Sequence, residues 1–300
     1  MRVGIVGLGK MGRVFVDRLL DAGHDVLVWN RSAGPAEEAR AKGAKVAASL
    51  GDLAEGSEIV LSIVTDEKVF PDIFEGPNGM LAGRPEGKLF VEMSTVAPPA
   101  HIALDEIVRA AGGHFLECPV SGSVTVAREG RCLGFAGGAA ADVERARPVL
   151  EVLCRQIEHA GEVGAGAALK LAINLPLAVF WQALGEALAI CEPYGFDPKR
   201  LVELFTESTG GANALKNRGP SVATALSGGE VPVTADIATF LKDMGLMIAT
   251  AKAQGHESPV IERARDAFAD ADKRGLGKID CSAYPAYWAK KGKSETIRGG

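Results

Sequence analysis

The chain has 300 residues, 47% of them hydrophobic and 24% charged, which excludes a disordered protein and suggests about two domains. A net charge of −5 argues against nucleic acid as a partner. Five cysteines without a Cys-x-x-Cys spacing favour a reducing, cytoplasmic compartment. The start does not read as a signal peptide, and the most apolar stretch lacks the ~20 uncharged residues of a span. We therefore expect a soluble protein with no membrane partner.

The N-terminal run RVGIV predicts a strand, and residues 14–22 predict a helix. Between them lies the sequence GLGKMG, which is the G-x-G-x-x-G fingerprint in its strand-to-helix context. Gly7 would permit the tight turn, Gly9 would let a pyrophosphate approach, and Gly12 would let the helix pack on the strand. The residues expected to line the cofactor here are Gly7, Leu8, Gly9, Met11 and Gly12. An empty glycine-rich turn is the alternative.

The second predicted strand, residues 25–29, ends in Asn30-Arg31-Ser32. A carboxylate at this point would accept a hydrogen bond from the ribose 2′-hydroxyl of NAD. This chain has Asn30 there, followed by Arg31, whose guanidinium suits a 2′-phosphate, and by Ser32 as a further donor. We therefore predict NADP rather than NAD as the cofactor. A solvated surface arginine is the alternative.

Further alternating units predict an α/β fold with a doubly wound sheet. β-rich runs occur at residues 58–64, 89–93, 114–119 and 132–136, and a helix is expected from about residue 142 to 154. Ligands of such sheets bind beyond the carboxyl ends of the strands. Val64, Thr65 and Thr95 follow two of these ends and should line the cofactor crevice.

The turn Ser121-Gly122-Ser123 follows the strand at 114–119. Backbone N–H groups in such a turn can form an anion-binding concavity, and the hydroxyls add donors. A substrate carboxylate is a natural occupant, although an isolated turn of this composition is more often only a turn.

The second half is predicted to be all-α. A long apolar helix over residues 163–191 carries Lys170 and Asn174 four positions apart, so both should face one spot. We expect this helix to be buried on nearly all sides and to kink after Asn174, because Pro176 removes a backbone donor. A lysine that reaches out to water is the alternative for Lys170. Helices should follow at residues 198–208, 213–227, 235–254 and 258–274.

No metal site is predicted. The histidines form no HExxH pattern, and the calcium-loop-like stretch from Asp270 fails because its twelfth position is Cys281.

In four ordered stretches the chain resembles the β-hydroxyacid dehydrogenase family, which includes 3-hydroxyisobutyrate dehydrogenases. The stretches are GLGKMG, CPVSGS with AREG after it, GEVGAGAALKLAIN and FLKDMGLMIATAKAQG. The resemblance implies a Rossmann-type domain over residues 1–162 and an all-α substrate and oligomerisation domain over 163–300, with an interdomain helix at 163–192. The Ser-Gly-Ser turn with Asn30-Arg31 is similar to the NADP-dependent glyoxylate/succinic semialdehyde reductase branch.

The resemblance also implies roles for individual residues. Lys170 would be the catalytic acid/base, Asn174 would orient the substrate, and Lys242 would reach the cofactor. Ser121, Gly122 and Ser123 would bind the carboxylate of a small substrate, and the protein would be a homodimer or homotetramer. An NADPH-dependent imine reductase and a non-catalytic NADP-binding module are the alternative functions, and the presence of Lys170 argues against both.

Overall fold

The computed structural model describes residues 1–296, with side chains through residue 291, and divides the chain into two compact units. One unit spans Met1–Leu171 and the other Ala172–Gly300, so the division falls inside helix α7 (Ala165–Cys191). We predicted a division after residue 162. The first turns of α7 belong with the first unit because they pack on its sheet: a Cβ at Gly166 would lie 2.2 Å from the carbonyl oxygen of Phe135.

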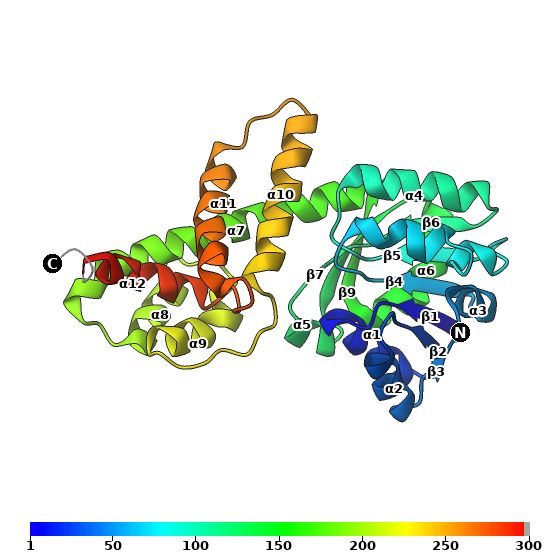
Figure 1. Ribbon diagram of the computed structural model, residues 1–300, viewed down its shortest axis with the longest axis horizontal. Helices are drawn as coiled ribbons and strands as arrows, with labels where there is room; N and C mark the ends of the chain where they lie inside the picture. The colour runs from blue at the N-terminus through cyan, green and yellow to red at the C-terminus, as the bar shows by residue number, and fades with distance from the viewer. Residues whose placement is uncertain (297–300) are drawn as a thin grey trace. The chain divides into compact units, whose positions relative to one another are not determined.

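The first unit is built on a nine-stranded sheet within the described residues (Figure 1). The order along the sheet is β3-β2-β1-β4-β5-β6-β8-β7, and β9 pairs with β8. The strands from β3 to β6 are parallel, whereas β8 runs antiparallel to β6 and β7. The strands are β1 (Arg2–Val6), β2 (Asp25–Trp29), β3 (Lys45–Val46), β4 (Ile59–Ser62), β5 (Leu89–Glu92), β6 (His114–Glu117), β7 (Val120–Ser121), β8 (Cys132–Gly137) and β9 (Cys154–Gly161).

Helices cover both faces of this sheet, and each face has its own core. On β4, Ile59 and Leu61 pack into one core, whereas Val60 packs into the other. The first core includes side chains of α1 and α6, and the second includes side chains of α3 and α4. Figure 1 shows α1 and α4 on opposite sides of the sheet. The helices are α1 (Lys10–Asp21), α2 (Ala33–Ala41), α3 (Leu50–Gly56), α4 (Pro98–Ala110), α5 (Val124–Arg128) and α6 (Ala140–Leu153). Strands buried on both faces explain the continuous apolar runs in the sequence.

The second unit is helical, and no named strand occurs in its described part. After α7 it contains α8 (Pro198–Glu207), α9 (Leu215–Leu226), α10 (Ile237–Ala253), α11 (Pro259–Ala271) and α12 (Tyr284–Thr296). We did not predict α12. Aromatic packing places it: the rings of Phe268 and Tyr284 stack 3.9 Å apart, and the Tyr284 hydroxyl donates to Gln182 of α7.

Helix α7 runs through Pro176 without interruption. The prediction that it is buried on nearly all sides was wrong in part, because Ile173 and Ile190 are 42% and 74% exposed. By length and composition alone, Ala165–Tyr194 would suffice to cross a membrane. Side chains such as Trp181 and Leu188 are buried, so part of this helix packs against other elements of the protein.

A buried carboxylate joins three segments of the second unit. Asp280 is 1% exposed, and its Oδ1 accepts from Arg218 Nη1 at 2.8 Å and from the Ser282 hydroxyl at 2.6 Å. Its Oδ2 accepts from the amide and hydroxyl of Thr234, both at 2.8 Å, and from the amide of Ala235. Burial alone would raise the pKa of Asp280, but the hydrogen bonds from Ser282, Thr234 and Ala235 outweigh it and hold that pKa well below its usual range.

Replacing Asp280 by alanine should lower the free energy of unfolding by about 3 kcal/mol, because the partly buried Arg218 and the donors of Thr234, Ala235 and Ser282 would lose their partner. The stabilisation from Asp280 should be complete above pH ~4 and lost as the pH falls further, because the folded pKa lies below the unfolded one. Urea unfolding followed by fluorescence of Trp181 and Trp288 would measure both effects. Asp266→Asn, at an exposed pair with Arg263, is the control and should change stability little. A stability loss no larger than the control's would contradict the role of Asp280.

Candidate active site

The glycine-rich loop has the conformation that its sequence predicted. Gly7 has a φ of +93°, and a Cβ there would lie 2.2 Å from the carbonyl oxygen of Ile63. A Cβ at Gly12 would lie 1.9 Å from the carbonyl oxygen of Gly7, so helix and strand pack too closely for any side chain. At Gly9 nothing lies within 4 Å of the Cβ position, and α1 begins at the next residue. The loop thus offers open space at the N-terminus of a helix, which is where dinucleotide phosphates bind.

Asn30 closes this loop against the end of β2. Its Oδ1 accepts from the amide of Leu8 at 2.9 Å, and its Nδ2 donates to the carbonyl and the hydroxyl oxygen of Ser32 at 2.9 and 3.0 Å. Both functional groups of the side chain are therefore engaged within the protein. Arg31 is exposed, and no ion pair or hydrogen bond of its side chain occurs among the described residues. The observed role of Asn30 is to shape the loop that presents Arg31.

The residues expected to line the cofactor crevice follow β4 and β5, and they lie at the same edge of the sheet as the glycine-rich loop. Ser62 pairs with Val6 on one side and with Glu92 on the other, so the three strands end together. The amide of Val64 donates to Ser94 Oγ at 2.7 Å. Thr65 is exposed and Thr95 half-buried. The structure brings Val64, Thr65 and Thr95 to one edge, and their contact with a cofactor stays a prediction.

The Ser121-Gly122-Ser123 turn joins β7 to α5. Gly122 has a φ of +154°, and a Cβ there would lie 3.0 Å from Cys132 Sγ on β8. Ser123 is the N-cap of α5, and its hydroxyl oxygen accepts from the amide of Val126 at 3.4 Å. The Ser123 hydroxyl proton remains available to a ligand, because this bond uses only the oxygen's lone pair.

Lys170 is 6% exposed on α7, which disfavours the alternative of a lysine that reaches out to water. It lies near Cys132: burial raises the pKa of the Cys132 thiol to about 11, and the charge of Lys170 acts in the opposite direction. The turn at Gly122 packs against Cys132 of β8, and Lys170 is close enough to act on the charge of the same side chain, within a single unit. The predicted acid/base and the predicted carboxylate turn are brought together.

Asn174 and Lys242 belong to the second unit. Asn174 is half-buried four positions after Lys170 on α7, and residues at this spacing share a helix face. Lys242 lies on α10 with its Nζ 3.1 Å from Asp243 Oδ1. The predicted contacts of Asn174 with substrate and of Lys242 with cofactor stay predictions.

Three buried polar residues near this site were not predicted. Glu92 and Glu117 end β5 and β6 at paired positions, His101 lies on α4, and all three are fully buried. The signal in the sequence was that the two predicted strands, LFVE and HFLE, carry a glutamate at the same place. A charged residue that is buried needs partners, which identifies such a position as a candidate for function.

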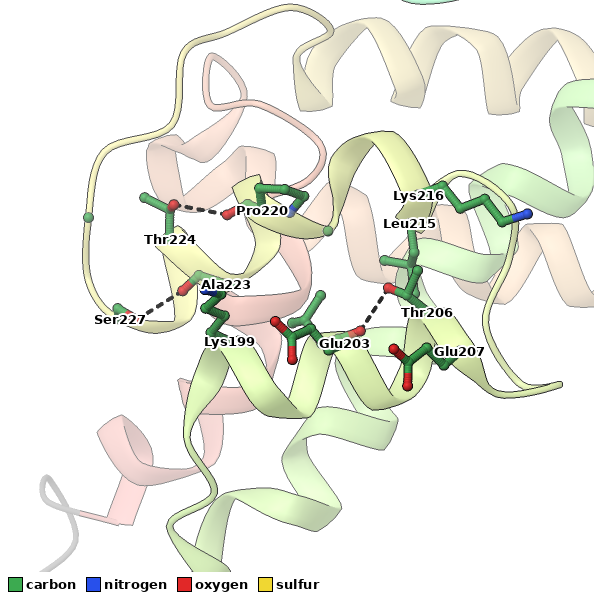
Figure 2. A pocket seen from close by; sticks show the side chains of 13 residues that line it. Lys199, Glu203, Thr206, Glu207, Leu215, Lys216, Pro220, Ala223, Thr224 and Ser227 are labelled. Carbon is green, nitrogen blue, oxygen red and sulfur yellow. Dashed lines mark hydrogen bonds between the residues drawn. The ribbon is translucent and has the colours of Figure 1, made fainter.

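A separate pocket of about 630 Å³ lies between α8 and α9 in the second unit (Figure 2). Val202 and Leu215 line it together with Lys199 and Glu203. The hydroxyls of Thr206 and Thr224 point into hydrogen bonds within their own helices (Figure 2). None of the predicted catalytic residues lines this pocket, so it contributes no group to hydride transfer.

Metal and thiol chemistry are not supported by the described residues. No group of three or more His, Cys, Asp or Glu residues in this part of the chain could hold a metal ion. Burial raises the pKa of Cys118 well above its usual range and that of Cys154 to about 12, so these thiols stay protonated.

Comparison with known proteins covers almost the whole chain. Residues 2–161 match the NAD binding domain of 6-phosphogluconate dehydrogenase, and residues 164–288 match the NAD-binding domain of NADP-dependent 3-hydroxyisobutyrate dehydrogenase. The chain is 35% identical to 3-hydroxyisobutyrate dehydrogenase of Pseudomonas aeruginosa, over 91% of this chain and 95% of that protein. It is 30% identical to glyoxylate/succinic semialdehyde reductase 1 of Arabidopsis thaliana, over 94% and 96%.

The fold is similar to that of known dehydrogenases as well. The crystal structure of 3-hydroxyisobutyrate dehydrogenase from Salmonella typhimurium matches with a TM-score of 0.85 at 26% identity, covering 95% of this chain and 99% of that one. Fold, motifs and relatives agree: the chain belongs to the β-hydroxyacid dehydrogenase family and is an oxidoreductase that transfers a hydride between a nicotinamide cofactor and its substrate.

Proposed function

We propose that the enzyme transfers a hydride between NADP(H) and a small β-hydroxyacid or semialdehyde carboxylate, with Lys170 as the general acid/base. The observation that carries this proposal is that the buried Lys170 acts electrostatically on Cys132, the residue against which the turn at Gly122 packs in the first unit. A relative at 30% identity is named for glyoxylate and succinic semialdehyde, which are both small aldehydes with a carboxylate.

The cofactor site would be formed by the glycine-rich loop and the strand ends beside it. The open space at Gly9 and the start of α1 fit a pyrophosphate. Val64, Thr65 and Thr95 lie at the same edge and would border the nicotinamide side of the site, with Lys242 as a further contact. The nicotinamide supplies the hydride chemistry when bound, and the protein supplies orientation and proton transfer.

The substrate carboxylate would bind at the Ser-Gly-Ser turn. Ser121 and Ser123 offer hydroxyl donors, and Gly122 leaves the backbone accessible because it has no side chain. Fixing the carboxylate restricts where the reacting carbon lies, which accounts for much of the rate gain in such enzymes.

Lys170 would give its proton to the carbonyl oxygen during reduction and take it back during oxidation. Its burial removes competing water, so its interaction with the developing alkoxide is strengthened. Asn174, one turn further along α7, would donate a hydrogen bond to the same oxygen without adding a charge.

We infer that the enzyme prefers NADP through Arg31. This side chain is exposed at the end of β2 and has no partner among the described residues, so it is available to a 2′-phosphate. A cytoplasmic location is part of the proposal and is supported by the five free cysteines of the chain.

The enzyme is also proposed to be a homodimer or homotetramer. Ile190, Tyr194 and Phe196 are 74%, 77% and 53% exposed within one short stretch, and exposed apolar groups of this kind mark interfaces. Light scattering on the purified protein should give a multiple of the 31.3 kDa chain mass. A monomer at micromolar concentration would contradict the proposal.

Replacing Arg31 by alanine should raise the KM for NADPH by roughly 10- to 100-fold, because a charge-assisted hydrogen bond pair is lost. The kinetics with NADH should change little. Arg40→Ala is a matched control, since Arg40 is an exposed arginine on α2 that pairs with Glu37. A wild-type enzyme that turns over only NADH, or an Arg31→Ala variant that behaves like the control, would refute the cofactor assignment.

Consumption of NADPH should be observed with glyoxylate, succinic semialdehyde, methylmalonate semialdehyde or tartronate semialdehyde. Lys170→Ala should reduce that turnover by roughly 10²- to 10⁴-fold, because proton transfer is lost. Affinity for NADPH, measured by fluorescence titration, should be retained. Lys170→Met, which keeps more of the buried volume, should behave in the same way. Equal loss of turnover and NADPH binding would contradict the catalytic role of Lys170. If the wild-type enzyme consumed no NADPH with any of the four compounds, the proposed substrate class would be wrong.

A further inference from the structure

Glu92 and Glu117 form a buried carboxylate pair at the catalytic edge of the sheet. They are partners in the register between β5 and β6, and neither is exposed to solvent. Two carboxylates in this position are costly to bury unless each has several donors. The hydrogen-bond donors to Glu92 come from β4 and from the loop after β5, whereas those to Glu117 come from the start of α7.

Glu92 binds the segments that would border the proposed cofactor site. Its Oε1 accepts from the amide of Ser94 at 2.7 Å, and its Oε2 accepts from the Ser62 hydroxyl. Ser94 Oγ in turn accepts from the amide of Val64, so one side chain shapes the loops after both β4 and β5. Burial raises the pKa of Glu92, while His101 and the hydrogen bonds from Ser62 and Ser94 act in the opposite direction.

Glu117 faces the start of α7. Its Oε1 accepts from the amides of Gly164 and Gly166, both at 2.7 Å. Gly164 immediately precedes the helix and Gly166 is in its first turn, so this carboxylate satisfies two amides that lack helical partners. Its negative charge also lies at the positive end of the helix dipole.

The space around Glu117 Oε1 permits only glycine at positions 137 and 166. A Cβ at Gly137 would lie 2.2 Å from Glu117 Oε1, and one at Gly166 would lie 3.1 Å from it and 2.2 Å from the Phe135 carbonyl oxygen. The first turn of α7 is therefore fixed against both β8 and the carboxylate. Gly166 and Lys170 are four positions apart, so the face that is fixed is the face that carries the lysine.

His101 lies beside Glu117, with its Nδ1 2.5 Å from Glu117 Oε2. It also acts electrostatically on Glu92, whose pKa it lowers. Its ring packs edge-on against Phe115 on β6. The histidine thus connects α4 to the two strand ends.

We propose that Glu117 is a positioning residue for Lys170: by accepting from the amides of Gly164 and Gly166, it sets the axial position and rotation of the helix that presents the lysine. The inference rests on the proposed role of Lys170. A slip of one residue at the helix start would move the lysine by about 1.5 Å and rotate it by about 100°. A misplacement of this size is enough to reduce turnover on the order of 100-fold.

The test is Glu117→Gln, which keeps the shape of the side chain and replaces two charge-assisted hydrogen bonds to the amides of Gly164 and Gly166 with weaker neutral ones. Turnover number should fall by roughly 10- to 100-fold, while the dissociation constant of NADPH changes less than about threefold. Asp142→Asn is the matched control. Asp142 is also a buried carboxylate close to a histidine, with its Oδ1 3.0 Å from His114 Nδ1. His114 is the first residue of β6, however, so this pair lies at the end of the strand opposite to Glu117. The control should keep the wild-type turnover number whatever its melting temperature.

A double variant separates positioning from a general loss of structure. In the Lys170→Met background, adding Glu117→Gln should change the residual turnover by less than about twofold, because the group that it positions is already absent. Additive losses, or an unchanged turnover number in Glu117→Gln, would overturn the inference. If Lys170→Met alone kept full turnover, the proposed function itself would fail instead. Should Glu117→Gln not fold, Gly166→Ala displaces the same helix start and should show the same loss of turnover and the same lack of additivity.

Discussion

The carboxyl-end edge of the sheet in the first unit depends on the burial of two carboxylates, Glu92 and Glu117, at the ends of neighbouring parallel strands. An ionised side chain in such a place is tolerated only when hydrogen-bond donors surround it. Here the donors are Ser62 and Ser94 for Glu92, and the amides of Gly164 and Gly166 for Glu117. Any other arrangement of these segments would leave a charge without partners. The same requirement that stabilises the fold therefore fixes the cofactor loops and the lysine helix in one geometry.

Close packing of backbone makes glycine necessary around this edge. Two glycines, Gly164 and Gly166, precede Lys170 in the sequence. In the structure the group that approaches Gly166 is the Phe135 carbonyl of β8, with the Glu117 carboxylate beside it. Gly12 is required in the same way by the carbonyl of Gly7. Gly9, in contrast, has open space around its Cβ position, as expected of a glycine in this loop that faces a ligand.

Features that depend on local sequence could be predicted, and those that depend on distant partners could not. The strands at 2–6 and 25–29, the fingerprint turn and the helices from α8 to α11 follow from periodicity and from glycine or proline signals. Helix α12 was missed because its place is set by the stacking of Tyr284 on Phe268 and by its bond to Gln182. The buried network of Glu92, His101 and Glu117 was missed for the same reason, since its donors lie on segments far apart in sequence.

The end of β2 shows how one residue can combine folding and selectivity. Asn30 accepts from Leu8 with its oxygen and donates to Ser32 with its nitrogen, so it uses both ends of the amide to close the loop. An aspartate here could accept from Leu8 but could not donate to Ser32. It would also place a negative charge at the proposed site of the 2′-phosphate, which would oppose binding of NADP by like-charge repulsion. The amide therefore gives a closed loop without that charge, and any attraction for the phosphate is left to the neighbouring Arg31.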